Sequence, residues 1–99
     1  MNRKLCFTKI VASGNDFVVI DQRKNKSIAR PASLAVRICD RKFGVGADGL
    51  LLMEKSPKAD VRMRIFNPDG SEPDMCGNGI RCAAVWMKLK NINIETRAR

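Results

Sequence analysis

The chain of 99 residues contains no histidine. This absence removes the commonest general base, the commonest zinc ligand and every Ser-His or Cys-His dyad from the candidate chemistry. No apolar run approaches the length of a membrane span, and no signal-type apolar stretch follows the basic N-terminus "MNRKLCFTKI". We therefore expect a cytoplasmic protein without a membrane partner.

The cysteines lack the spacing of a redox or zinc motif, because none of the four belongs to a CxxC pair. Without a secretory signal, a disulfide framework is not expected either. Cys6, Cys39 and Cys82 have no glycine neighbours, and we interpret them as small hydrophobic residues of strands and helices. Cys76 is different and is treated below.

Acidic residues are scarce relative to basic ones: 10 Asp and Glu stand against 19 Lys and Arg, for a net charge of +9. A basic balance raises nucleic acid as a partner. The positive charges are scattered, however, with one loose cluster at Arg23–Lys26 and no aromatic residues interleaved with it. A solvated basic surface is the preferred interpretation, and no specific nucleic-acid binding is expected.

The apolar pattern predicts the element order β-β-α-β-β-α-β in an α/β (α+β) domain. The strands are expected over Leu5–Ala12, Phe17–Asp21, Leu50–Glu54, 61–66 and 92–97. Turns are expected at 13–16 and at Asn67–Ser71. One helix should start at Pro31 and end before Gly44, and a second should run from after Cys76 to about Lys90. The second helix is apolar nearly all round, which predicts a buried central helix.

The stretch "PDMCGNGIRCAAVWMK" places Cys76 at a glycine-rich turn where the second helix begins. The first turn of a helix presents unpaired N–H groups and the positive end of the macrodipole, and both favour a thiolate. The N–H groups of Gly77, Asn78 and Gly79 could hold a carboxylate there. A base beside an anion cradle suits removal of a proton α to a carboxylate. A buried structural cysteine is the equally weighted alternative.

Two other loops have simpler interpretations. The segment "GVGADG" lacks the Lys-Ser/Thr of a phosphate loop and precedes a strand, so a tight connection is favoured. Asn15 and Asn67 stand in turns, where asparagine commonly satisfies its own backbone.

Three stretches together resemble the N-terminal half of diaminopimelate epimerases. They are "SGNDFVVID", "RKFGVGADGLLL" and "RMRIFNPDGSEPDMCGNGIRCAA", in the same order and spacing along essentially the whole chain. The resemblance implies that residues 1–99 are an incomplete N-terminal domain, a curved mixed sheet wrapped around a central buried helix. The C-terminal half, which would be its partner across an active-site cleft, is absent from these residues.

The resemblance also implies a function. Members of this family interconvert LL- and meso-2,6-diaminopimelate in lysine and peptidoglycan synthesis, without pyridoxal or a metal cofactor. One cysteine from each half acts, one as thiolate base and the other as thiol acid. By position, Cys76 resembles the N-terminal cysteine, Gly77 and Asn78 resemble residues that hold the reacting carboxylate, and Asn15 and Asn67 resemble substrate-binding asparagines.

Two departures and three alternatives accompany this interpretation. The His-Gly pair that usually precedes the first glycine turn is Val11-Ala12 here, and Gly49 stands where many members carry Gln. The alternatives are another cofactor-independent racemase or epimerase of the same fold, an inactive fragment that binds protein or nucleic acid, and a homodimer with two copies of Cys76 across one cleft.

Overall fold

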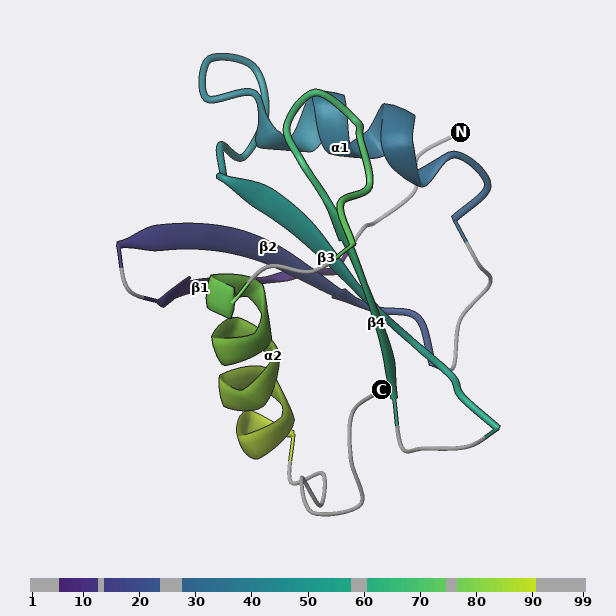
Figure 1. The fold of residues 1–99 in the computed structure, drawn as a ribbon. Coiled ribbons are helices and arrows are strands. Elements are labelled where there is room, and N and C mark those ends of the chain that lie inside the picture. The colour runs from purple at the N-terminus through teal and green to yellow at the C-terminus, as the bar shows by residue number, and fades with distance from the viewer. Residues whose placement is uncertain (1–5, 13, 24–27, 58–60, 75–76, 91–99) are drawn as a thin grey trace.

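The structure is a computed structural model that describes residues 6–12, 14–23, 28–57, 61–74 and 77–90. These segments form four strands and two helices (Figure 1). In chain order they are β1 (Thr8–Ala12), β2 (Asn15–Asp21), α1 (Pro31–Cys39), β3 (Gly49–Glu54), β4 (Arg62–Phe66) and α2 (Gly77–Leu89). The mixed α and β class is confirmed, and the strand predicted over 92–97 lies outside the described residues.

The four strands form one mixed sheet in the order β1-β2-β3-β4. Strands β1 and β2 are antiparallel, β2 and β3 are parallel, and β3 and β4 are antiparallel. A parallel pair needs a crossover connection, and α1 supplies it on one face of the sheet (Figure 1). The central register runs from Phe17 opposite Gly49 to Asp21 opposite Met53.

Both faces of the sheet are buried, which explains the unbroken apolar runs of β2 and β3. Successive side chains of a strand point to opposite faces, so each run divides between two cores. The core on the α1 side consists of Val18, Ile20, Ala35, Ile38, Cys39, Ala47, Leu50, Leu52 and Phe66. The core on the α2 side consists of Ile10, Phe17, Val19, Leu51, Met53, Val61, Ile65, Cys82, Ala83, Trp86 and Met87.

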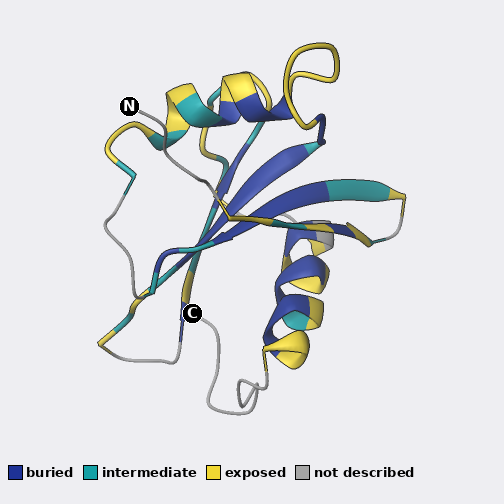
Figure 2. Cartoon of the chain, turned by 180° about the vertical axis from the view of Figure 1, so that it is seen from behind, coloured by how far each residue is buried: buried dark blue, intermediate teal, exposed yellow. Residues whose placement is uncertain are grey.

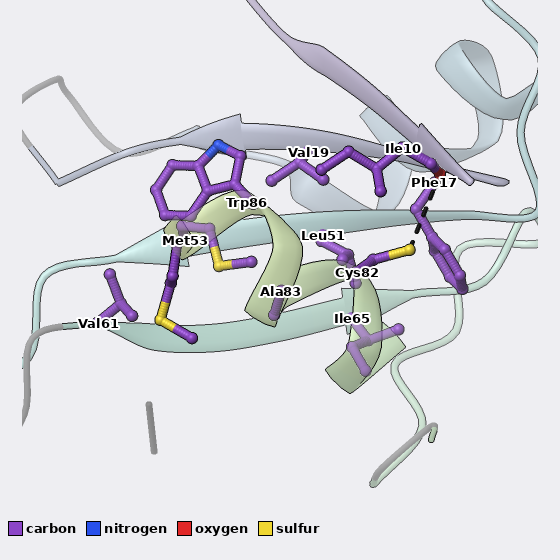
Figure 3. Packing of buried hydrophobic residues seen from close by; sticks show 11 residues of the cluster. Ile10, Phe17, Val19, Leu51, Met53, Val61, Ile65, Cys82, Ala83 and Trp86 are labelled. Carbon is purple, nitrogen blue, oxygen red and sulfur yellow. Dashed lines mark hydrogen bonds between the residues drawn. The ribbon is translucent and has the colours of Figure 1, made fainter. Parts of the chain in front are cut away.

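Helix α2 is anchored to the sheet at two levels (Figure 3). Near its start, Cys82 lies beside Phe17, with its Sγ 3.8 Å from the carbonyl oxygen of Ile10. Further along, Trp86 lies over Val19 and Met53 and is 1% exposed. The helix therefore begins at the end of the sheet where β2 and β3 begin.

The first predicted turn is shorter than expected. The sequence predicts a turn over 13–16, but Asn15 and Asp16 belong to β2, where they pair with Ala12 and Val11 of β1. Gly14 has φ of 83°, a left-handed conformation that glycine adopts without steric cost. A two-residue connection between antiparallel strands leaves Asn15 already within the ladder, which fixes its backbone.

Burial of α2 is less complete than its composition suggests. Ile80, Val85 and Leu89 are exposed by 45%, 45% and 67%. Figure 2 shows this exposed side of α2 in yellow, pointing away from the sheet. The prediction of a helix buried all round is thus not met by the described residues, because the four strands cover α2 from one side alone.

Neither of the two helices in the described part of the chain is long and apolar enough to cross a membrane.

Candidate active site

The structure brings three sequence-predicted features to one end of the sheet. Asn15 begins β2, and β3 starts at the same end because it runs parallel to β2. Strand β4 returns to that end, with Phe66 opposite Leu50, so that Asn67 follows directly after it. Since neighbouring strands lie about 4.8 Å apart, β2 and β4 are separated by about 10 Å. The start of α2 lies at this end too, as Cys82 beside Ile10 and Phe17 shows.

Asn15 is held by a cluster of charged residues, here called the Asp16 cluster: Lys9, Asp16, Arg41 and Asp48. The amide Nδ2 of Asn15 donates to Oδ2 of Asp48 at 3.1 Å. The same Asp48 oxygen accepts from the backbone N of Asp16 at 3.0 Å, and the backbone N of Asp48 donates to the carbonyl of Asp16 at 2.8 Å. These bonds tie the start of β2 to the residue before β3.

Two basic residues complete the Asp16 cluster. The Arg41 guanidinium donates to both carboxylate oxygens of Asp16, at 2.8 and 3.2 Å, and to Oδ1 of Asp48 at 3.1 Å. Lys9 pairs with Asp16 at 2.9 Å and donates to the carbonyl of Gly46. The Arg41 guanidinium, followed by the Lys9 ammonium, holds the pKa of the Asp16 carboxyl far below its ordinary value. The Asp16 carboxylate therefore stays ionised at neutral pH, and its bonds to Arg41 and to the backbone of Asp48 fix the loop between α1 and β3.

Asp16→Asn is expected to lower the free energy of unfolding by about 1 kcal/mol at neutral pH, because Arg41 and Lys9 lose a charged partner. A lowered folded-state pKa gives stabilisation that is present above the unfolded pKa, near 3.9, and lost as the pH falls towards the folded value. The difference from wild type should thus be constant above about pH 5 and shrink below about pH 4. Urea denaturation over this range measures it, with the exposed Asp74→Asn as control. An equal difference at all pH values would contradict this account.

Asn67 opens the second predicted turn, and the structure confirms that turn. The backbone N of Gly70 donates to the carbonyl of Asn67 at 2.9 Å, and the backbone N of Asn67 donates to the carbonyl of Ser71 at 2.8 Å. The sequence suggested that the side chain of Asn67 would bond its own backbone, but the structure shows a different partner. The Nδ2 of Asn67 lies 2.9 Å from the Oγ of Ser71.

Gly70 allows this turn to lie against α1. Its φ is 91°, and a Cβ there would be 3.1 Å from the carbonyl oxygen of Ala32 and 3.2 Å from Cγ2 of Val36. Both the backbone conformation and the close approach to α1 therefore favour glycine at this position. The turn is supported by the helix and does not project freely into solvent.

An ion pair fixes the segment that follows the turn. Arg64 of β4 forms a two-bond fork with Glu72, at 2.9 and 2.8 Å, and lies 3.5 Å from Glu54 of β3. Its guanidinium also stacks over the Phe66 ring, 5.1 Å from the centroid. The carboxylate of Glu72 raises the pKa of Arg64 further above its usual range. This fork anchors Glu72, in the segment after the turn, to strand β4.

The predicted anion cradle lies at the N-terminus of α2. Gly77 is the first residue of the helix, and Asn78 is the second. A Cβ built on Gly77 would meet no atom within 4 Å, so the backbone here faces open space. The first N–H groups of a helix have no partner within the helix, so this position keeps the character that the sequence predicted for an anion cradle. Cys76, which directly precedes α2 in the sequence, lies outside the described residues.

The remaining cysteines follow the sequence interpretation in part. Cys39 and Cys82 are buried in the two cores, whereas Cys6 is exposed. Burial raises the pKa of the Cys39 thiol, which keeps it protonated and unreactive at neutral pH. Among the described residues, no group of three His, Cys, Asp or Glu side chains is arranged to hold a metal ion.

The two departures from the family pattern have structural counterparts. A Cβ at Gly49 would lie 2.8 Å from Cε1 of Phe17, so the phenyl ring occupies the space that a longer side chain would need. Val11 is 68% exposed on β1, at the same end of the sheet as Asn15.

Sequence reasoning missed Asp48 and Ser71, which bond the side chains of Asn15 and Asn67. It also missed Arg41, which bonds Asp16 and Asp48 beside Asn15. The segment "GVGADG" was expected to be a tight connection, and it is one, but its aspartate also holds Asn15. The signal available was an aspartate placed directly before the buried strand β3.

Comparison with known proteins identifies the family. The sequence model of the family described as diaminopimelate epimerase matches residues 7–99. The chain belongs to the diaminopimelate epimerase family. The diaminopimelate epimerase of Carboxydothermus hydrogenoformans is 56% identical over 100 residues, covering 93% of this chain and 36% of the relative. That of Desulforudis audaxviator is 50% identical over 91 residues, covering 92% of this chain and 33% of the relative.

The chain thus spans about a third of the length of these diaminopimelate epimerases. Solved structures of the same fold come from the PhzF family of phenazine biosynthesis proteins. The protein from Enterococcus faecalis matches with a TM-score of 0.60 at 19% identity, over 81% of this chain and 27% of its own. The Bacillus anthracis protein has a TM-score of 0.57 at 23% identity, over 89% of this chain and 28% of its own. These likenesses confirm the predicted fold class.

Proposed function

We propose that this chain forms one half of the active site of a diaminopimelate epimerase, which interconverts LL- and meso-2,6-diaminopimelate. The observation that carries the proposal is the meeting of Asn15, Asn67 and the start of α2 at one end of the sheet. These residues come from three separate parts of the sequence. Their shared location is what a substrate-binding surface requires, and the chain's membership of the diaminopimelate epimerase family supports diaminopimelate as the substrate.

In this proposal Cys76 is the thiol that removes or delivers the α-proton. The N–H groups of Gly77 and Asn78 hold the carboxylate next to the reacting carbon, where charge develops as the proton leaves. The open space beside Gly77 supports this role, since a Cβ added there would meet no atom within 4 Å. Asn15 and Asn67 bind other polar groups of the substrate. The chemistry uses thiols alone, without pyridoxal or a metal ion, in the cytoplasm, as a step towards lysine and peptidoglycan.

Inversion of a carbon centre needs a base on one face and an acid on the other. One thiol can remove the proton but cannot deliver another to the opposite face. The second thiol would come from a C-terminal half of the kind that makes up the rest of the relatives' length. The exposed residues Ile80, Val85 and Leu89 of α2 leave room for further covering elements, as the family fold implies.

Complementation tests this proposal. The 99-residue chain by itself is expected to show no epimerisation of LL-diaminopimelate, and adding the remaining part of the Carboxydothermus hydrogenoformans enzyme should produce turnover. Chiral chromatography of the product measures it, and the added part alone is the control. Failure of the pair to turn over substrate while forming a complex would contradict the proposal. Activity of this chain alone that rises with its dimer population would support the homodimer alternative.

A further inference from the structure

We propose that Ser71 is a positioning residue that sets which way the side-chain amide of Asn67 faces. Its Oγ accepts from the Nδ2 of Asn67 at 2.9 Å, and its own hydroxyl hydrogen goes to Oδ1 of Asp69 at 2.6 Å. The role in catalysis rests on the proposed function, in which Asn67 binds substrate. The orientation itself follows from the contacts within this chain.

The number of hydrogens available to the Asn67, Ser71 and Asp69 side chains decides the orientation of the Asn67 amide. A serine hydroxyl has one hydrogen to donate and two lone pairs to accept with, and a carboxylate can only accept. The hydrogen bonds from Ser71 lower the pKa of the Asp69 carboxyl, so it is ionised at neutral pH. The hydroxyl hydrogen therefore lies towards Asp69, and Ser71 offers Asn67 a lone pair. The NH₂ of the Asn67 amide must face Ser71, and the amide oxygen must face away.

The backbone of the turn keeps these three residues in place. The backbone N of Ser71 also donates to Oδ1 of Asp69, at 2.9 Å, so the carboxylate receives two bonds from one residue. The bonds between Asn67 and Ser71 and between Gly70 and Asn67 close the turn. Gly70 then packs against Ala32 of α1. Ser71 thus makes four hydrogen bonds, two through its Oγ, one through its backbone N and one through its carbonyl oxygen. These bonds restrict the rotation of its side chain.

A fixed amide selects the chemistry of its ligand. With the NH₂ committed to Ser71, the oxygen of Asn67 can receive a donor from the substrate, and an amino acid with two ammonium groups supplies such donors. A reversed amide would present NH₂ to that ammonium group, with no lone pair to accept its hydrogen. Correct orientation before binding also avoids the cost of ordering the side chain at the moment of binding.

The orientation can be tested on the chain itself by ¹⁵N NMR of the Asn67 side-chain NH₂. Ser71→Ala should shift these resonances and speed their exchange with water, because the acceptor is lost. Ser71→Thr keeps the hydroxyl and should leave them close to wild type. Ser33→Ala, which removes an exposed hydroxyl from α1, is the matched control. Unchanged Asn67 resonances in Ser71→Ala would overturn the proposal.

The role in binding is tested in the complemented complex. Ser71→Ala should lower kcat/KM for LL-diaminopimelate by about three- to tenfold, the effect of one lost hydrogen bond, and Ser71→Thr should restore it. In an Asn67→Ala background, Ser71→Ala should have no further effect, because it acts through Asn67. Independent, multiplying losses would refute the positioning role. If the wild-type complex has no activity at all, the proposed function fails, while the NMR result still decides the orientation.

Discussion

Cys76→Ala is expected to abolish the turnover of the complemented complex, with a loss of at least about a thousandfold in kcat. The proposed reaction transfers a proton to or from this thiol directly, and alanine can do neither. Proton exchange at the substrate α-carbon in D₂O and conversion of LL- to meso-diaminopimelate both measure the loss. The first assay detects removal of the proton even where inversion is not completed.

Cys82→Ala is the matched control, because it makes the same chemical change, loss of a thiol, at a cysteine six positions further along the chain. Cys82 is fully buried in the core between α2 and the sheet, with Sγ 3.8 Å from the carbonyl of Ile10. Its loss should cost about 1 kcal/mol of stability and leave most of the turnover. Turnover of Cys76→Ala within tenfold of wild type, with Cys82→Ala equally active, would assign the proton transfer to some other group.

Trp86→Ala is expected to be the most damaging change to stability. The indole is 1% exposed and lies at the centre of the core on the α2 side, over Val19 and Met53. The Arg23 guanidinium lies over the ring, 5.2 Å from its centroid. Truncation of a buried tryptophan typically costs about 3–5 kcal/mol, and a domain of this size has about 5–15 kcal/mol in total.

Urea denaturation followed by far-ultraviolet circular dichroism measures this change, since the variant has lost its one tryptophan as a fluorophore. Leu89→Ala is the control on the same helix, because Leu89 is 67% exposed and should change the free energy of unfolding by less than about 0.5 kcal/mol. If Trp86→Ala lowered the free energy of unfolding no more than Leu89→Ala does, this result would contradict the packing of α2 on the sheet described above.

The sequence predicts the elements of this fold well, for a physical reason. The runs Phe17–Ile20 and Leu50–Met53 are short, apolar and bounded by polar residues, which is the pattern of strands buried on both faces. Pro31 fixes the start of α1, as expected for proline in a first helical turn. These signals are local, so a single sequence contains them in full.

The contacts that hold the candidate site are less visible in the sequence. Arg41 and Asp16 are separated by 25 positions and meet because β2 and β3 run parallel. No local sequence pattern predicts the contact between Arg41 and Asp16. The exposed side of α2 was missed for a related reason, since an apolar helix does not reveal which of its sides the sheet covers. The family resemblance supplied the site residues themselves, whereas their neighbours had to come from the structure.

The parallel pairing of β2 with β3 joins the two halves of the sheet, and we expect unfolding to be a single event. Strands β1 and β2 form one antiparallel pair and β3 and β4 another, and each core takes residues from both pairs. Neither pair has a core of its own, and isolated two-stranded units are at best marginally stable in water. Parting the two pairs would expose both cores together, so no half of the sheet can persist once the other is lost. Trp86 fluorescence and far-ultraviolet circular dichroism of the wild-type chain should therefore report one superimposable transition.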